Sequence, residues 1–197
     1  MYSYRKMSPE EKVEALKYRH LMGFPLHEPP HIEHDNPMYL ITAATYEHRK
    51  ILTPEARRVW LGRKLFEHLT SMRDCRVYAW VILLNHYHLL LRASLSALRI
   101  ALGKVHNAAS SSWNREDDAV GRRVWYRFAD RAIRNERHFW ATVNYLHANP
   151  VRHGLVAACD AWRCSSVHLY LEEHGEAVML ELMRAYPTLD YGKGWDI

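Results

Sequence analysis

With 197 residues, 48% of them hydrophobic and only eight glycines and eight prolines, the chain is long enough for one globular domain with a sizeable core. No apolar run approaches the length of a membrane span, and the N-terminus does not read as a signal peptide. The chain has three cysteines, an odd number, and they lack a Cys-x-x-Cys spacing. These features argue against a membrane protein and a disulfide-built secreted protein, and they predict a reduced, cytoplasmic protein. The net charge of +5 is modest, so its distribution along the chain is more informative than its size.

The first part of the chain predicts a helix, a loop and a strand. The run Ser8-Pro9-Glu10-Glu11 opens a polar helix over 9–22, which ends near Gly23. A loop rich in Pro and His follows over 25–37. Apolar and β-branched residues over 38–46 then indicate a strand.

A second helix is predicted after this strand. Thr53 has the residue type of an N-cap, and Pro54 suits the first helical position. The helix is expected to run to Met72. Its apolar stripe is expected to consist of Val59, Leu65, Phe66 and Leu69.

The middle of the chain predicts a tight hairpin, with strands over 77–84 and 86–92 that turn near Asn85. A helix over 97–112 and a polar surface loop over 114–121 follow. This order of elements predicts an α+β protein in which helices pack on one face of an antiparallel β-sheet.

The C-terminal part predicts one strand and two helices. The strand lies around 124–128, and a helix over 136–149 must stop near Asn149, because Pro150 disfavours helix at the residue before it. The tail contains one more helix, over 174–185.

The most specific short motif is Asn85-His86-Tyr87-His88, which lies between two apolar runs. In an extended strand, residues two apart point to the same face, so His86 and His88 project side by side. Two imidazoles at that spacing can converge on one metal ion. Two core histidines with ordinary hydrogen-bond partners are the other interpretation, and the motif alone leaves both open.

Positive charge is concentrated between residues 122 and 137. This segment contains six arginines and only two acidic residues, Asp130 and Glu136, so its net charge is +4. The rest of the chain is therefore nearly neutral. Arginine makes forked contacts with phosphate, and the interleaved aromatic side chains offer stacking surfaces for bases. A nucleic-acid contact and a solvated charged face are the two alternatives. The residues predicted to contact DNA are Arg122, Arg123, Trp125, Arg127, Arg131, Arg134 and Arg152.

The helix over 136–149 carries a second pair of candidate residues, Tyr145 and Asn149, which are four apart and lie on one edge of its apolar stripe. Taken alone, the tyrosine can be an amphipathic packing residue and the asparagine a helix stop. A phenol is a poor nucleophile at neutral pH, but a divalent ion held by two imidazoles and an amide oxygen can orient a phosphodiester for its attack. Such a mixed ligand set suits Mg²⁺ or Mn²⁺.

Together these motifs resemble those of a known protein family. Residues 79–90 resemble the His-hydrophobic-His strand of the HUH-type single-tyrosine transposases. Residues 124–156, with Tyr145-Leu146-His147-Ala148-Asn149-Pro150, look like the subgroup of REP-associated tyrosine transposases. The resemblance covers roughly residues 38–170. One departure is Leu84, at the place where the family strand usually carries a proline before Asn-His.

The resemblance implies a ferredoxin-like fold in which His86 and His88 ligate the metal, Tyr145 is the catalytic nucleophile, and Asn149 is a third ligand or a metal-assisting catalytic group. It also implies single-stranded or hairpin DNA as the partner and leaves monomer and homodimer open. The predicted domain covers 38–170, with an N-terminal extension over 1–37 and a C-terminal helix and tail over 171–197.

The leading hypothesis is a cytoplasmic, nucleoid-associated enzyme. It would cleave and rejoin single-stranded DNA near REP-type palindromes through a 5′-phosphotyrosine intermediate. The alternative is a hairpin-binding module for DNA or RNA whose catalytic residues are vestigial. A metallohydrolase of small phosphoesters is a third and weaker interpretation.

Overall fold

The computed structural model describes residues 7–21 and 38–192. Four antiparallel strands form one sheet in the order β2-β3-β1-β4. The connection is βαββαβ, the ferredoxin-like arrangement, which confirms the predicted α+β class. The elements of this unit are β1 (Met38–Ala44), α3 (Glu55–Thr70), β2 (Arg76–Ile82), β3 (His86–Arg92), α4 (Leu95–Glu116) and β4 (Ala129–Ala132). Outside it lie α2 (Pro9–Leu21), η1 (Tyr46–His48), α5 (Glu136–Arg152), η2 (Cys159–Ala161) and α6 (Val167–Ala185).

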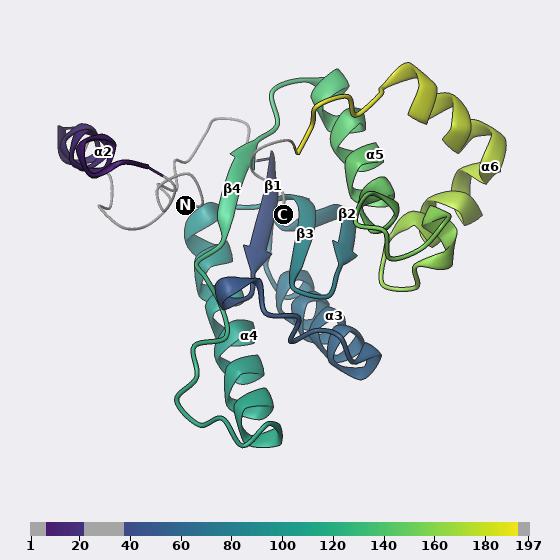
Figure 1. The fold of residues 1–197 in the computed structure, drawn as a ribbon. Coiled ribbons are helices and arrows are strands. Elements are labelled where there is room, and N and C mark those ends of the chain that lie inside the picture. The colour runs from purple at the N-terminus through teal and green to yellow at the C-terminus, as the bar shows by residue number, and fades with distance from the viewer. Residues whose placement is uncertain (1–6, 22–37, 193–197) are drawn as a thin grey trace.

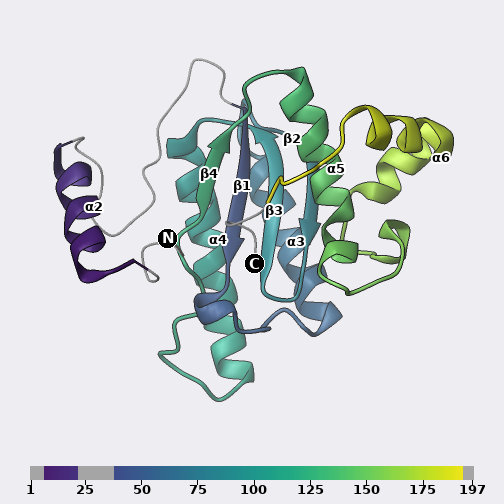
Figure 2. The same ribbon diagram turned by 45° about the horizontal axis from the view of Figure 1, so that its top comes forward.

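Helices cover both faces of the sheet. Figure 1 and Figure 2 show α3 and α4 on one side, as the sequence predicted for the helices, and α5 on the other. The core of the first face joins both helices to the sheet through side chains such as Leu65, Leu102 and Tyr87. The core of the second face joins α5 to the sheet through Val143 and Leu146. The prediction of helices on one face therefore holds for the βαββαβ unit and misses α5.

Strand β3 connects the two cores because its side chains alternate between them. Leu89 and Leu91 belong to the core under α3 and α4, whereas Leu90 belongs to the core under α5. All three are buried, and each fully buried side chain of this size contributes about 1.5–3 kcal/mol to stability. By the same alternation His86 and His88 lie on the α5 face. The turn between β2 and β3 forms as predicted, with Leu83 N donating to His86 O at 2.8 Å.

The predicted start of α2 is confirmed. Ser8 Oγ accepts from the backbone N–H of Glu11, and the Glu11 carboxylate accepts from Ser8 N, at 3.2 and 2.7 Å. This reciprocal pair is a capping box. The predicted loop over 25–37 lies outside the described residues. Among the residues that are described, no helix is long and apolar enough to cross a membrane.

The predicted start and stripe of α3 are partly wrong. Thr53 does not cap the helix; its hydroxyl donates to Lys50 O at 2.7 Å, and Pro54 occupies the N-cap position. Val59 is 57% exposed, whereas Leu65 and Leu69 are buried as expected. The buried row runs at intervals of four through Leu61, Leu65 and Leu69, because i and i+4 lie on one line of a helix.

Three other boundaries differ from the prediction. Helix α4 extends to Glu116, into the expected polar loop. The strand expected around 124–128 forms only an isolated bridge between Trp125 and Thr45, and β4 proper begins at Ala129. Helix α6 begins at Val167 rather than 174, and Gly175, with φ of 78°, interrupts it.

The predicted end of α5 at Asn149 is also wrong. The helix continues through Pro150 to Arg152, and His153 N donates to Asn149 O at 3.0 Å. Proline in the last turn removes a single helical hydrogen bond, and the buried ring offsets part of that loss. Gly154, at φ of 65°, follows the helix end. This longer helix carries the candidate site one turn further than the sequence indicated.

Candidate active site

The two histidines of β3 lie side by side, as the strand geometry predicts. Their ring centroids are 4.9 Å apart, and the ring planes are inclined by 78°. Both side chains are buried, with 1% of His86 and none of His88 exposed. The two rings therefore face the same small volume between β3 and α5.

The Nδ1 atom of each ring lies within hydrogen-bond distance of an oxygen atom. His86 Nδ1 lies 2.8 Å from Asn85 Oδ1, which can only accept, so the neutral ring that makes this hydrogen bond has its proton on Nδ1 and its lone pair on Nε2. His88 Nδ1 lies 2.8 Å from Thr42 Oγ1, across the β1–β3 register that pairs Thr42 with His88. Histidines that ligate metals are oriented in this way, by an oxygen on the other ring nitrogen. The sequence did not indicate the roles of Asn85 and Thr42.

Helix α5 places a row of three side chains opposite these rings. Tyr145, Asn149 and His153 are spaced by four residues and so follow one line of the helix. The Tyr145 hydroxyl is 3.3 Å from His88 Nε2, and the His153 ring is 5.1 Å from the His86 ring between centroids. Asn149, which is fully buried, lies between these two contacts on the same row. The structure thus brings together the predicted residues His86, His88, Tyr145 and Asn149.

His153 joins this group although sequence reasoning assigned it no role. The predicted helix stop at Asn149 hid its place in the row, because the i+4 spacing continues only if the helix continues through Pro150. The spacing of Tyr145, Asn149 and His153 was the available signal.

The residue types gathered here are ones that could hold a divalent ion with open coordination positions. Two imidazole nitrogens and one amide oxygen are neutral ligands, suited to Mn²⁺ or Mg²⁺ when an anionic phosphate completes the sphere. Within residues 7–21 and 38–192, no group of three His, Cys, Asp or Glu side chains is arranged to hold a metal. The site is therefore unlike a closed structural metal centre built from four such ligands.

The chain is similar to known proteins of one kind. No protein-family model matches the chain. Over 102 residues the chain is 30% identical to the REP-associated tyrosine transposase of Escherichia coli (strain K12), a match that covers 49% of this chain and 56% of that protein. A solved REP-associated tyrosine transposase bound to a REP hairpin matches 70% of this chain and 81% of its own, with a TM-score of 0.53 and 20% identity. The predicted resemblance is confirmed.

This resemblance to REP-associated tyrosine transposases has defined limits. The chain spans just over half the length of the E. coli protein. At 20% identity the structural match shows the fold, and the four-stranded antiparallel sheet with its helices is what the two structures share.

A positive charge lies over the candidate nucleophile. The Arg152 guanidinium carbon is 5.4 Å from the centroid of the Tyr145 ring. Arg152 is exposed, and it comes from the last turn of the same helix. The guanidinium therefore places an exposed positive charge beside the Tyr145 ring.

The C-terminal segment covers Tyr145. After α6 the chain returns across the sheet, as Figure 1 and Figure 2 show. The Tyr191 ring lies 5.0 Å from the Tyr145 ring between centroids. The Tyr191 hydroxyl is 2.8 Å from Thr142 Oγ1 and 3.1 Å from His138 Nε2, and burial raises the pKa of Tyr191. None of the Tyr145 side chain is exposed in this arrangement.

The predicted DNA-contacting residues fall into two groups. Arg123, Arg127, Arg131, Arg134 and Arg152 are exposed. Arg123 lies over the rings of Tyr46 and Tyr126, at 4.7 and 5.6 Å. These five arginines are accessible to a partner, and their contact with DNA stays a prediction.

The other two residues are engaged inside the fold. Arg122 donates to Asn114 Oδ1 at 2.9 Å and to Asp117 Oδ2 at 2.7 Å, within an ion-pair network that also includes Arg57. Trp125 is only 7% exposed. The structure gives both residues a packing role, and their contact with DNA stays a prediction.

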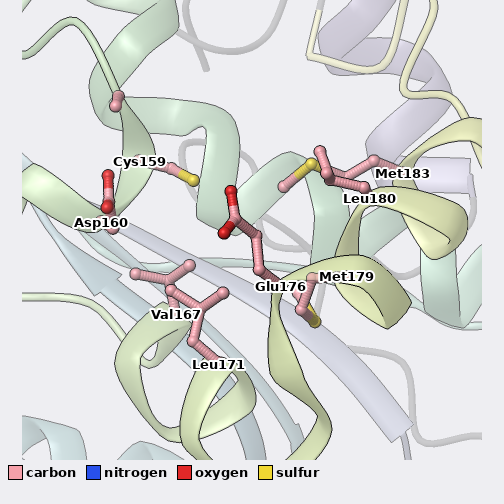
Figure 3. Close-up of a pocket in the computed structure, with 9 residues that line it drawn as sticks. Cys159, Asp160, Val167, Leu171, Glu176, Met179, Leu180 and Met183 are labelled. Atoms are coloured by element: carbon pink, nitrogen blue, oxygen red, sulfur yellow. The ribbon is translucent and has the colours of Figure 1, made fainter.

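A cavity of about 470 Å³ lies away from these residues, between η2 and α6 (Figure 3). Its lining is mainly apolar, and Glu176 extends from α6 toward Cys159 within it. Burial raises the pKa of the Cys159 thiol, so this thiol stays protonated and weakly reactive at neutral pH. None of the predicted site residues lines this cavity.

Proposed function

We propose that the chain is a metal-dependent tyrosine transposase that cleaves and rejoins single-stranded DNA near hairpins. The observation that carries the proposal is the 3.3 Å approach of the Tyr145 hydroxyl to His88 Nε2, beside a second histidine whose Nδ1 also lies 2.8 Å from an oxygen atom. The similarity to the E. coli REP-associated tyrosine transposase and to a hairpin-bound structure of this kind supports it. REP-type hairpin DNA is accordingly the proposed partner.

In this proposal His86, His88 and Asn149 hold a divalent ion, Mn²⁺ or Mg²⁺. The bound ion supplies Lewis-acid polarisation of the phosphodiester and neutralises charge in the transition state. The protein's own contribution is orientation: Asn85 and Thr42 fix the two rings, and the fold holds them beside the nucleophile. The attacking hydroxyl lies beside the proposed ligands, so a phosphodiester held there would be within its reach.

The chemical step is a transesterification. The Tyr145 oxygen forms a bond to phosphorus as the bond from phosphorus to the 3′ oxygen breaks, which leaves a 5′-phosphotyrosine and a free 3′-hydroxyl. The phenol loses one proton and the departing 3′ oxygen gains one, so the step is balanced. The ester bond is conserved, and attack by a 3′-hydroxyl on the phosphotyrosine rejoins the DNA.

The five exposed arginines would hold the DNA backbone. Arg152 lies beside Tyr145, whereas Arg131 lies 6.0 Å from the Tyr191 ring, so both flank the covered nucleophile. Phosphate contacts of this kind position a strand without reading its sequence. They would also make binding sensitive to salt, since each contact releases counterions.

One observation favours a second function, a hairpin-binding module without catalysis. Tyr145 is completely buried under Tyr191, so the nucleophile is closed to DNA in this arrangement. A vestigial enzyme would keep the arginines and lose nothing by such a cover. The two functions differ in whether a covalent link to DNA ever forms.

An adduct assay separates them. The protein would be mixed with 3′-labelled single-stranded hairpins from the flanks of its own gene, with Mn²⁺, Mg²⁺ or EDTA, and resolved on a denaturing gel. Strand transfer predicts a metal-dependent labelled band at the mass of protein plus DNA, absent in Tyr145→Phe and present in the matched control Tyr170→Phe. Retarded binding on a native gel without any covalent band, across several hairpins, would support the binding module instead.

A further inference from the structure

A cavity of about 380 Å³ opens on the face of β3 opposite the histidine pair. It lies between α4 and the chain segment 125–128 that leads into β4. One of its wall residues, His106, places Nε2 2.8 Å from the hydroxyl of Tyr87, the residue between His86 and His88. The cavity and the candidate active site are thus on the two sides of one strand.

The inner end of this cavity is aromatic: His106 and Trp125 line it and stack on one another, and Trp125 is 7% exposed. The rings of His106 and Trp125 are 4.3 Å apart and nearly parallel, at 10°. Burial lowers the pKa of His106 to about 3, so the ring is neutral at physiological pH and stacks as an uncharged aromatic. The aromatic ring surface that lines the cavity, which also includes Tyr126, can pack against a nucleobase of any sequence, because every base has a π-face.

The rim of the cavity is polar and positive. Arg99 and Asn107 of α4 and Arg127 of the opposite wall are exposed and line it. Two guanidinium groups suit the phosphates on either side of a base, and an amide offers both a donor and an acceptor to a base edge. Among the described residues that line the cavity there is no carboxylate to repel a phosphate.

Gly103 keeps the cavity open on the α4 side. A Cβ atom built at this position meets nothing within 4 Å, so the space beyond the backbone is empty of protein atoms. Glycine inside a helix is less favourable than alanine. A glycine here therefore leaves room that almost any other residue would begin to fill.

We propose that this cavity binds one unpaired nucleobase of single-stranded DNA, with the flanking phosphates on Arg99 and Arg127. The inference rests on the proposed function and adds a base-binding site on the far side of β3. The cavity is close to the active site along the sheet: Tyr126 N donates to Ala44 O at 2.9 Å, and Ala44 pairs with His86. Arg123 lies over Tyr46, just after the end of β1, and over Tyr126, which lines the cavity.

The test is an abasic scan combined with cavity variants. The probe is a fluorescent single-stranded hairpin from the flanks of the gene, with unpaired arms on both sides, in which each unpaired nucleotide in turn lacks its base. Binding would be measured for the wild type, for Gly103→Leu, which fills the cavity, and for Arg99→Ala. Arg115→Ala is the matched control, because it removes one exposed arginine from the same α4 helix about 24 Å along its axis.

We expect one abasic position to weaken wild-type binding roughly 10-fold, within the range for the loss of one stacked base. Gly103→Leu should weaken binding of the intact hairpin by a similar factor. This variant should then bind the intact hairpin and the hairpin with that abasic position equally well. Arg99→Ala should weaken binding several-fold, and Arg115→Ala should not do so. Circular dichroism would check that Gly103→Leu folds, and Arg99→Ala tests the same cavity without filling it.

Different outcomes separate the cavity from the proposed function. A flat abasic scan in a protein that still forms the Tyr145 adduct overturns the base-binding cavity alone. An abasic effect that persists unchanged in both Gly103→Leu and Arg99→Ala places the base elsewhere and overturns it too. The expected scan in a protein that forms no adduct supports the cavity while overturning strand transfer. Tight binding of free mononucleotides, without discrimination among hairpin positions, would replace DNA by a small nucleotide as the ligand.

Discussion

The Tyr145 hydroxyl lies 3.3 Å from Nε2 of His88, so the candidate nucleophile and a candidate metal ligand touch directly. The two residues come from different elements, α5 and β3, and the ring of His88 is fixed from a third, because Thr42 of β1 lies 2.8 Å from its Nδ1. Each contact spans more than 40 residues of sequence. The geometry of the site therefore depends on the folded sheet and helix. A substitution in β1 can change the orientation of the His88 ring while Tyr145 itself is left unchanged.

Substitution of Thr42 by valine is expected to weaken Mn²⁺-dependent adduct formation about 10- to 100-fold, the usual effect of removing a hydrogen bond that orients a metal ligand. Valine keeps the shape of threonine and leaves Nδ1 of His88 without this oxygen. Thr42→Ser keeps the hydroxyl and should restore most of the activity, and hairpin binding should be unchanged in both variants. Full activity in Thr42→Val, measured on the same denaturing gel, would show that this contact does not orient the ring for catalysis.

Removal of the Tyr191 ring is expected to accelerate adduct formation. Tyr145 must be uncovered before DNA can reach it, and Tyr191 contributes the ring that lies 5.0 Å away. The loss of about 1 kcal/mol of ring contact corresponds to about a five-fold larger population of open molecules. Initial rates for Tyr191→Ala would be compared with Tyr186→Ala, which truncates a ring stacked on Trp140 in the same tail. A rate that is unchanged or lower in Tyr191→Ala would mean that the ring supports the site rather than covers it.

The local patterns of this sequence were sufficient for most of the fold. Alternation over 86–92 places His86 and His88 on one face, and the 3.6-residue period of α5 places Tyr145 and Asn149 on one row, so both pairs were predicted from spacing alone. Asn135 caps α5 as its residue type indicates, with Oδ1 accepting from His138 N at 2.8 Å. These features depend on residues a few positions apart.

The rest of the site depends on contacts between distant segments, which spacing cannot reveal. Thr42 reaches His88 only through the β1–β3 register, and Tyr191 reaches Tyr145 only because the tail returns across the sheet. His153 was missed for a different reason: tertiary packing carries α5 through Pro150, against the local preference of the chain. Arg122 looked like its neighbouring arginines, yet Asp117 and Asn114 bind it within the fold.

Replacement of Arg127 and Arg131 by alanine is expected to flatten the salt dependence of hairpin binding by about one to two units of slope, at roughly 0.7 per phosphate contact to a single strand. Both arginines are exposed; Arg127 lines the 380 Å³ cavity and Arg131 lies in β4. The measurement is the binding constant as a function of salt concentration. The double variant Arg63→Ala and Arg73→Ala removes the same charge from α3 and the turn after it, and it should leave the slope unchanged. Equal slopes for all three proteins would identify the arginine-rich segment as a solvated face.

Arg122 is expected to act on stability, through Asp117. Hydrogen bonds from Arg57 and Arg122 lower the pKa of Asp117 to about 2, below the ordinary value near 3.9. A carboxylate with a lowered pKa stabilises the fold above its ordinary pKa, and this contribution is lost as the pH falls from about 4 to 2. The side chain is 30% exposed, so solvent screening limits the effect to roughly 0.5–1 kcal/mol.

The variant Asp117→Asn should therefore lower the free energy of unfolding in urea at pH 7 by that amount and match the wild type near pH 2. Asp118→Asn is the matched control, because Asp118 has φ of 50°, which asparagine adopts readily, and it should show no such pH dependence. A deficit for Asp117→Asn that persists at pH 2 would mean that packing, rather than charge, is what the network contributes. A deficit that disappears as the pH falls to 2 would show that Arg122 stabilises the fold through the charge of Asp117. Phosphate contacts would then be expected from the exposed arginines instead.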